Sequence, residues 1–356
     1  MQPLVPSLTA QPALSRPATE LCREEQGGIL RCVACAHRCR IPEGGRGICG
    51  VRHVANGLLH VPYGYVSSLA CDPIEKKPLY HFLPGSEVLS FGMLGCNFHC
   101  EFCQNWSISQ AGRDELAEAL PQRIEAAEIV RQARRRATPA IASTYNEPLV
   151  SLEWSLEIFR QAKAAGIRTC YVSNGFASPE ALALLEPWLD AINVDLKCFS
   201  EEGYQQLGGH LQPVLDTIRW LAARGIWVEA TTLVVPGFND SPEELTACAE
   251  FLASVDPNLP WHVSAFHAAY RWDRGVARTP AATIERAVAC GREAGLHYVY
   301  VGNLGGDAHS DTLCPTCGIA VLVRRGFDLR RSEVVNGACT ACGTPIPGVF
   351  ALPDNG

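Results

Sequence analysis

Three cysteines lie within eight residues in the stretch GCNFHCEFCQN, which runs from residue 95 to residue 105. They are Cys96, Cys100 and Cys103, separated by three and then two residues. The same spacing would place them on one face of a helix, but Gly92 and Gly95 just before them favour an irregular loop that can aim three sulfurs at one point. Three thiolates suit a zinc ion that lacks its fourth ligand, or a [4Fe–4S] cluster with one bare iron. A bare iron would let a small molecule bind the cluster directly.

The segments around this loop predict an α/β fold. From residue 87 onward, short β-branched segments alternate with longer amphipathic segments that have helical periodicity. Ser-Pro-Glu and Thr-Pro pairs predict helix starts. The alternation predicts a parallel sheet with crossover helices, as a full or partial α/β barrel or a doubly wound sheet. The expected strands are 87–93, 139–146, 167–174, 191–197, 226–235, 261–268 and 297–303, and the expected helices are 123–136, 149–166, 178–189, 211–225, 241–255 and 279–295.

Polar residues follow the carboxyl ends of these strands, where chemistry gathers in such folds. A single polar loop is ordinary at a surface, but six polar strand ends on one edge favour an active site. Asp195 and Lys197 alternate onto one face of a strand end, so both charges should point inward and pair or meet a ligand. Besides the three cysteines, the candidate site residues at this edge are Phe102, Thr144, Asn146, Glu147, Asn174, Asp195, Lys197 and His267.

Two further groups hold four cysteines each, and both are predicted metal sites. Near the N-terminus the gaps are two, three and nine residues, which fits structural zinc or an accessory iron–sulfur cluster better than a reduced hairpin. His37 could replace one of these thiols. Near the C-terminus, CPTC and CTAC are each followed by glycine, as in a rubredoxin-type or zinc-ribbon knuckle that carries zinc or iron. The two groups are Cys32, Cys35, Cys39 and Cys49, and Cys314, Cys317, Cys339 and Cys342.

The composition of the chain argues against several classes of partner and location. The net charge is −7 and the sequence pI is near 5.8, so no basic face indicates nucleic acid or an anionic membrane as a partner. No apolar run of about 18 residues predicts a membrane span. Seventeen cysteines in a large chain without an export signal favour a reducing cytoplasm. The expected organisation is a disordered tail (1–20), a Cys-rich region (21–85), a barrel (86–305) and a metal-binding knuckle (306–356).

The cysteine loop resembles that of the radical SAM superfamily, in which Cys-x3-Cys-x2-Cys with an aromatic residue before the last cysteine follows the first barrel strand. The resemblance implies a partial TIM-like barrel and a [4Fe–4S] cluster on Cys96, Cys100 and Cys103. S-adenosylmethionine (SAM) would bind the open iron and be cleaved to methionine and a 5′-deoxyadenosyl radical. The cofactor does the difficult chemistry, and the protein positions it.

The same resemblance implies roles for the strand ends. TYNEP stands where the superfamily often has Gly-Gly-Glu, which holds the ammonium of SAM, so Thr144, Asn146 and Glu147 are candidate acceptors. Asn174 is a candidate ligand of the ribose. The Asp195–Lys197 motif and a histidine at the position of His267 resemble the SAM contacts of glycyl-radical-enzyme activators.

The stretches DPIEKKPLYHFLPG (72–85) and TYNEP resemble, more narrowly, the radical SAM protein of the AmmeMemoRadiSam system, a group related to pyruvate formate-lyase activating enzymes. This implies an external flavodoxin- or ferredoxin-like electron donor and an unidentified small-molecule or protein substrate. Two alternatives stay open: an activase that takes hydrogen from a glycine of a partner protein, and a non-catalytic electron carrier or adaptor.

Overall fold

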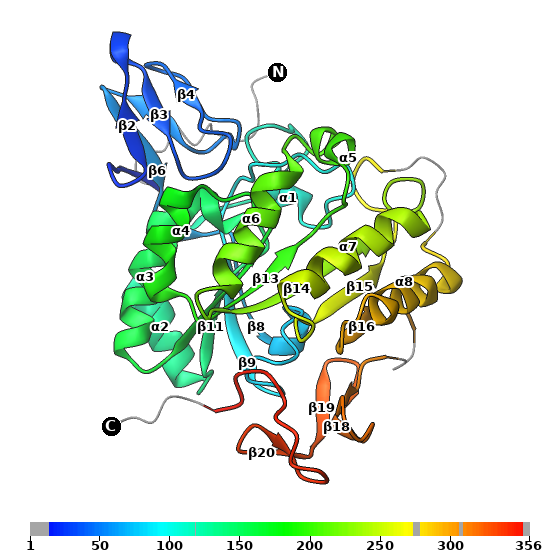
Figure 1. Ribbon diagram of the computed structural model, residues 1–356. Coiled ribbons are helices and arrows are strands. Elements are labelled where there is room, and N and C mark those ends of the chain that lie inside the picture. Colours follow the sequence, from blue (N-terminus) through cyan, green and yellow to red (C-terminus); the bar gives the residue numbers. More distant parts are fainter. Residues whose placement is uncertain (1–13, 118, 273–277, 306–308, 352–356) are drawn as a thin grey trace.

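The computed structural model describes residues 14–117, 119–272, 278–305 and 309–351, and its centre is an eight-stranded sheet (Figure 1). Seven strands run parallel in chain order, and β8 pairs antiparallel with β9 at one edge. All seven expected strands are present; β8 was not foreseen. The strands are β8 (Ser68–Pro73), β9 (Glu87–Gly92), β11 (Ala140–Ser143), β12 (Arg168–Ser173), β13 (Ala191–Asp195), β14 (Trp227–Val234), β15 (Trp261–Ala265) and β16 (Val299–Gly302).

The helices cover one face of this sheet (Figure 1). Neighbouring parallel strands follow one another in sequence, so right-handed crossovers place every intervening helix on the same side. This order excludes a doubly wound sheet. The sheet is open, with β16 and β8 as its edges, so a closed barrel is excluded as well. The covering helices are α2 (Ala126–Arg135), α3 (Leu152–Ala164), α4 (Pro179–Leu185), α6 (Leu211–Ala222), α7 (Pro242–Val255) and α8 (Ala281–Glu293).

Helix starts follow the capping rules. The hydroxyls of Ser178 and Ser241 accept hydrogen bonds from the third residue of α4 and α7, and proline occupies the first turn of each. Two short helices were missed, α1 (Trp106–Ser109) and α5 (Glu201–Gln206). With only one or two turns each, they carry little periodic signal.

Small antiparallel sheets form the N-terminal part of the chain. β2 (Cys22–Glu24), β3 (Leu30–Cys32) and β4 (Arg40–Ile41) make one sheet, and β1 (Ser15–Pro17), β5 (His53–Ala55) and β6 (Leu58–Pro62) make another. Residues 1–13 of the expected disordered tail lie outside the described residues. The rest of that tail is attached instead, because β1 pairs with β6 and Leu14 is buried. Nearby, β7 (Tyr65–Val66) pairs with β10 (Gln122–Arg123). β8 belongs to the central sheet, although it precedes the expected boundary at residue 85.

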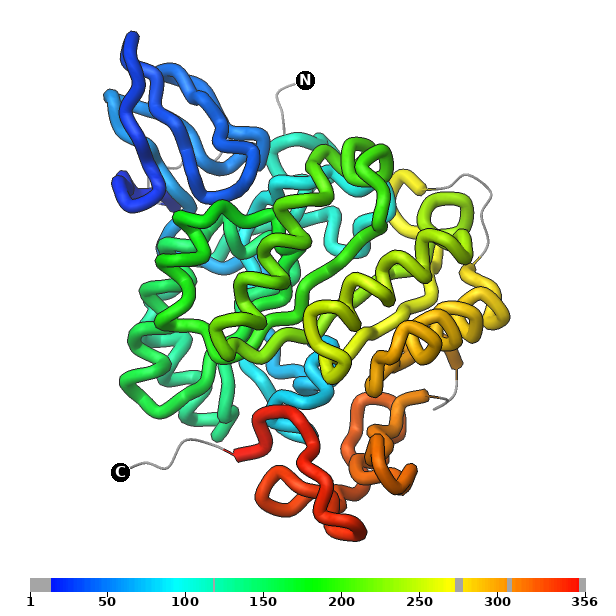
Figure 2. Tube along the Cα trace, in the orientation of Figure 1, coloured from blue at the N-terminus to red at the C-terminus, as the bar shows by residue number. Residues whose placement is uncertain are grey.

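The C-terminal ribbon, residues 309–351, lies at the far end of the molecule from β2–β4 (Figure 2). It contains β17 (Thr312–Leu313), β18 (Ala320–Arg325), β19 (Asp328–Ser332), β20 (Val334–Val335) and β21 (Ala338–Cys339). Buried Arg324 attaches it to the rest of the fold by pairing with Glu75 of η4 (Ile74–Lys76) and donating to the Tyr80 carbonyl. No helix among the described residues has both the length and the apolar character of a membrane span.

Candidate active site

The cysteine loop, residues 93–105, directly follows β9 and is fixed by two side chains. The Asn146 amide oxygen accepts from the Met93 N–H (2.9 Å), and its NH2 group donates to the Gly95 carbonyl (3.0 Å). Arg113 donates to the carbonyls of Cys96 and Phe98, both at 2.8 Å. The side chains of Asn146 and Arg113 therefore hold in place the backbone that carries the thiols.

Cys96, Cys100 and Cys103 all line one cavity of about 460 Å³. They are the only cysteines among its lining residues. The Phe98 N–H donates to the Cys96 sulfur (3.3 Å), and the Ser109 hydroxyl lies 3.1 Å from the Cys103 sulfur. A backbone N–H thus donates to the Cys96 sulfur, and a hydroxyl lies within hydrogen-bond distance of the Cys103 sulfur, which suits thiolate ligands. Phe102 lines the same cavity and packs against Phe238 and Trp272.

Glu147 lies at the centre of the polar lining. Its carboxylate accepts from the N–H groups of Leu149 (3.0 Å) and Asn174 (2.8 Å) and from the Ser173 hydroxyl (2.8 Å). Burial nevertheless raises the pKa of the Glu147 carboxyl to about 7, although the N–H groups of Asn174 and Leu149 oppose the shift. Thr144 and Asn146 line the cavity beside it.

Asn174 holds the cysteine loop as well as lining the cavity. Its NH2 group donates to the amide oxygen of Asn97 at 2.7 Å, and its own amide oxygen accepts from the Phe176 N–H. Asn146 and Asn174 therefore both have partners that set the position of the thiols. This second task could not be predicted from local sequence patterns, because it depends on contacts between distant segments.

Asp195 and Lys197 form the predicted ion pair at 2.8 Å, and both line the cavity. Burial lowers the pKa of Lys197, but the charges of Asp195 and Cys100 outweigh burial and raise it overall. Lys197 is therefore a cation beside the Cys100 sulfur. A positive charge there offsets the negative charge of metal-bound thiolates.

His267 is the one candidate that the structure keeps out of the cavity lining. Its ring is exposed and lies 3.1 Å from the Gln104 amide, on the residue after Cys103. His262, five residues earlier, lines the cavity instead and pairs with buried Glu229 at 2.7 Å. The expectation for His267 came from its position after the strand; side chains inside β15 alternate, and that alternation directs His262 inward.

The inner face of the sheet adds residues that the sequence reading missed. Asn193 and Thr231 line the cavity, and the Asn193 amide oxygen and the Thr231 hydroxyl are buried without a hydrogen-bond partner in the structure. Two-residue alternation from Asp195 could have found Asn193. Buried polar atoms without partners are uncommon, so they indicate a polar ligand at this level of the cavity.

Tyr145 belongs to the TYNEP segment, which stands where a Gly-Gly-Glu motif was expected. Its backbone has φ of +70°, a conformation that favours glycine. The side chain turns into the cavity, where the hydroxyl donates to Asp72 at 2.6 Å and lies 3.2 Å from Lys77. A non-glycine residue held in this conformation at a cavity is typical of functional sites.

The C-terminal cysteines form a compact tetrad. The sulfurs of Cys314, Cys317, Cys339 and Cys342 all lie within 4.8 Å of one another; that of Cys314 is 3.5 Å from that of Cys342, and that of Cys317 is 3.8 Å from that of Cys339. A tetrahedral zinc or iron ion with ligands at about 2.3 Å requires sulfurs about 3.8 Å apart. The tetrad therefore fits a single metal ion.

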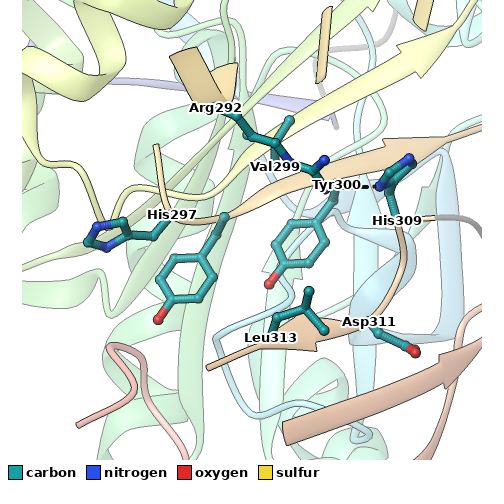
Figure 3. Close-up of a pocket in the computed structure, with 8 residues that line it drawn as sticks. Arg292, His297, Val299, Tyr300, His309, Asp311 and Leu313 are labelled. Atoms are coloured by element: carbon teal, nitrogen blue, oxygen red, sulfur yellow. Dashed lines mark hydrogen bonds between the residues drawn. The ribbon is translucent and has the colours of Figure 1, made fainter. Parts of the chain in front are cut away.

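A second cavity, of about 520 Å³, lies between α8, β16 and the ribbon (Figure 3). Arg292 and His309 meet across it at 3.3 Å. It opens at the amino end of β16, the opposite end from the cysteine loop, and no cysteine lines it. The cavity of the three thiols is therefore the candidate active site.

Several known proteins are similar to this chain. The profile of the Radical SAM superfamily matches residues 92–249. The chain is 39% identical to the Uncharacterized protein MJ0808 of Methanocaldococcus jannaschii over 89% of this chain and 95% of that protein. It is 27% identical to the Pyruvate formate-lyase-activating enzyme of Listeria monocytogenes over 57% of this chain and 84% of that enzyme. A radical SAM methyltransferase structure from Sphaerobacter thermophilus aligns over 92% of this chain and 86% of its own, with a TM-score of 0.49 and 14% identity.

Proposed function

Because the chain belongs to the radical SAM superfamily and is related to pyruvate formate-lyase-activating enzymes, we propose that it is an AmmeMemoRadiSam-type enzyme. In this proposal, Cys96, Cys100 and Cys103 hold a [4Fe–4S] cluster. When bound, the cluster and SAM supply a 5′-deoxyadenosyl radical that takes hydrogen from a substrate. The observation that carries the proposal is the single cavity that joins three thiols to a buried polar lining.

The lining residues fit both groups. Three thiols, without a fourth cysteine among the lining residues, leave one position for a small-molecule ligand. In the proposal, Glu147 accepts from the ammonium of SAM once its carboxyl is ionised, and Thr144 adds a hydroxyl acceptor. Lys197 offsets thiolate charge beside Cys100. Asn146 and Asn174 act through the cysteine loop, because their side chains are bonded to it.

The inner face supports a small polar substrate. The free acceptor of Asn193 and the hydroxyl of Thr231 lie on strands that also carry Asp195 and the cavity-lining His262. A substrate with a hydroxyl or amino group would satisfy them. Tyr145 and Lys77 also line the cavity, and both donate hydrogen bonds to Asp72 outside the lining.

A second candidate is an activase that takes hydrogen from a glycine of a partner protein. Its support is the identity to enzymes named pyruvate formate-lyase-activating enzyme. The two functions differ in what stimulates turnover. A low-molecular-weight filtrate of cell extract should increase 5′-deoxyadenosine release under the first function, and only the protein fraction should do so under the second.

The proposal is tested by anaerobic reconstitution with iron and sulfide. Wild-type protein given dithionite and SAM should release 5′-deoxyadenosine and methionine, measured by liquid chromatography and mass spectrometry. A variant with Cys96, Cys100 and Cys103 changed to Ala should release neither. The matched control changes three cysteines outside all groups, Cys71, Cys248 and Cys290, and should stay active. Wild-type protein that never yields 5′-deoxyadenosine would refute the proposal.

A further inference from the structure

We propose that Cys32, Cys35, Cys39 and Cys49, here called the N-terminal thiol group, hold a second iron–sulfur cluster of the four-iron class. We further propose that this cluster passes electrons to the cluster on Cys96, Cys100 and Cys103. Only the second step rests on the function proposed above. The first stands on the N-terminal region itself.

The four N-terminal thiols converge from three short segments. Cys32 ends β3, and its N–H donates to the Cys39 carbonyl at 2.9 Å, so the chain returns on itself between them. Cys49 lies in the turn before β5, where a side chain at Gly47 would lie 3.7 Å from the Cys39 sulfur. Burial raises the pKa of the Cys35 thiol, and the neighbouring thiols of Cys32, Cys49 and Cys39 raise it further. The four thiols therefore lie near one another in the fold.

Their spacing differs from that of the C-terminal tetrad. Within the described part of the chain, Cys314, Cys317, Cys339 and Cys342 are the only set of three or more Cys, His, Asp or Glu residues whose ligand atoms lie within 4.8 Å of one another. No three sulfurs of the N-terminal thiol group lie that close to one another, and neither do the three sulfurs of the cysteine loop. A four-iron cube holds its thiolates farther apart than one tetrahedral ion does. The N-terminal thiol group therefore matches the larger cofactor.

Arg52 provides independent evidence for a hydrogen-bond acceptor beside the N-terminal thiol group. Its side chain is 2% exposed, pairs with Glu153 of α3, and lies near enough to Cys32 and Cys49 for their charges to raise its pKa against the effect of burial. Its Nε–H is buried and has no hydrogen-bond partner in the structure. Buried donors without partners are rare. Sulfur atoms of an iron–sulfur cluster accept N–H bonds, and such bonds tune its potential.

The N-terminal thiol group adjoins the cysteine loop. Gly95, the residue before Cys96, packs so closely that a Cβ there would lie 3.0 Å from the Cys49 carbonyl oxygen and 2.6 Å from Val51. His37 lies 2.9 Å from the Asn97 carbonyl, and Arg113 links the Ile48 carbonyl to that of Cys96. The backbone of the cysteine loop therefore packs directly against the region that carries the N-terminal thiol group. Electron transfer slows steeply with distance, so adjacent clusters can exchange electrons.

The relay changes only oxidation states. A one-electron protein donor of the ferredoxin or flavodoxin class reduces the N-terminal cluster by one electron. That electron passes to the cluster at Cys96, Cys100 and Cys103, and the N-terminal cluster returns to its oxidised state. No bond or proton is exchanged in this step.

The first experiment isolates the N-terminal cluster. The full-length variant with Cys96, Cys100 and Cys103 changed to Ala is reconstituted anaerobically, and its iron, sulfide and zinc are counted. We expect about four iron and four sulfide ions per chain, beyond a single ion without sulfide in the C-terminal tetrad. Dithionite should produce an electron paramagnetic resonance signal of a reduced cluster. Zinc without labile sulfide would overturn the proposal, whatever the outcome of the SAM assay.

Two further pairs of substitutions, each added to the variant that lacks Cys96, Cys100 and Cys103, show which cysteines hold the cluster that gives the signal. Cys35→Ala with Cys49→Ala should remove the sulfide, whereas Cys317→Ala with Cys342→Ala should leave it in place. Circular dichroism checks that both variants fold. Should the first pair not fold, Arg52→Gln is the alternative, because it removes the free Nε–H and should shift the reduction potential of the cluster. An unchanged potential would contradict the role of Arg52.

The second experiment tests the relay with Cys96, Cys100 and Cys103 intact. With a reduced flavodoxin as donor, Cys35→Ala/Cys49→Ala should release 5′-deoxyadenosine about tenfold more slowly than wild type. With photoreduced deazaflavin, which can reach the active-site cluster directly, the two rates should agree within about twofold. Equal losses with both donors would indicate a structural role and overturn the relay. A wild-type protein inactive with both would refute the proposed function but not the cluster count.

Discussion

At the scale of a single residue, Glu147 has a pKa that lets ligand binding change its protonation state near neutral pH. Three donors hold its carboxylate, yet burial keeps its pKa near 7. A cation that arrives beside it can therefore shift the group to its ionised form. SAM brings such a cation in its ammonium group. Near neutral pH the carboxyl would then be partly protonated in the empty site and ionised in the occupied one.

We predict that SAM binds more tightly as the pH rises through about 7. The ionised carboxylate accepts from an ammonium better than the protonated acid does. Glu147→Gln should weaken binding about tenfold above pH 7 and remove this pH dependence. Equilibrium dialysis of SAM against reconstituted protein measures both, with exposed Glu250→Gln as the control. An affinity of the wild type that does not vary across this range would contradict the assignment.

The same group predicts how the stability of the apoprotein depends on pH. The folded-state pKa of Glu147 lies above its usual value of 4.5. Its contribution to stability is therefore fully present below about pH 4.5 and is lost as the pH rises through 7. The free energy of unfolding of wild type should fall relative to that of Glu147→Gln over this interval. Urea titrations at several pH values provide the comparison; parallel curves would show that the shift is absent.

At the scale of elements, the junction between β9 and the cysteine loop depends on Gly95. Its φ is +92°, and its close contacts with Val51 and Cys49 leave no room for a side chain. This contact joins the N-terminal region to the active-site loop. It therefore affects both the stability of the fold and the positions of the thiols.

Gly95→Ala should destabilise the protein by about 3 kcal/mol, since backbone strain and overpacking add. Gly57→Ala is the matched control: its φ is +70°, but nothing lies within 4 Å, so only strain of about 1 kcal/mol is expected. Urea denaturation of the two apoproteins measures the difference. Equal losses would show that the contact with Val51 and Cys49 contributes nothing.

The strands and helices of the central sheet could largely be predicted from the sequence. Whether the sheet closes into a barrel could not. Periodicity and proline-serine starts identified all seven parallel strands and their helices, because these are local signals. β8 was missed because Ser68–Pro73 shows no alternation and ends in proline. The open edge between β8 and β16 depends on which strands pair, which local patterns do not specify.

Within the site, prediction succeeded where strand alternation applies. Asp195 and Lys197 pair as expected. His267 does not line the cavity, because it follows the end of β15, where strand alternation no longer sets the direction of a side chain. The structural tasks of Asn146 and Asn174 could not be foreseen, since their partners lie 51 and 77 residues away.

At the scale of the whole molecule, a buried cation is one of the contacts that attach the C-terminal ribbon to the rest of the fold. Arg324 is fully buried, pairs with Glu75 at 3.4 Å, and donates to the carbonyls of Tyr80 and Ser310. Its guanidinium also lies 4.3 Å from the Tyr80 ring centre. The segment that includes Glu75 and Tyr80 lines the active-site cavity, so this attachment reaches the candidate site.

Arg324→Met should cost about 3–5 kcal/mol, because it leaves the buried Glu75 carboxyl without its cationic partner. Arg330→Met removes an exposed pair with Asp328 in the same ribbon and should cost less than about 1 kcal/mol. Adding Glu75→Gln to Arg324→Met should restore part of the loss. Denaturant unfolding of wild type, Arg324→Met, Glu75→Gln and the double variant completes the cycle, with Arg330→Met as the control. Equal costs for the two arginines would refute the attachment.

The turn between β18 and β19 places Phe327, from near the end of the chain, on the lining of the cavity that holds the three thiols. The reaction chamber is thus assembled from segments more than two hundred residues apart. A shortened chain that ends after β16 would keep every cysteine of the loop, yet its chamber would lack part of one wall. Selectivity for the substrate should therefore vary among relatives with the length and sequence of this turn, even where their sheets are alike.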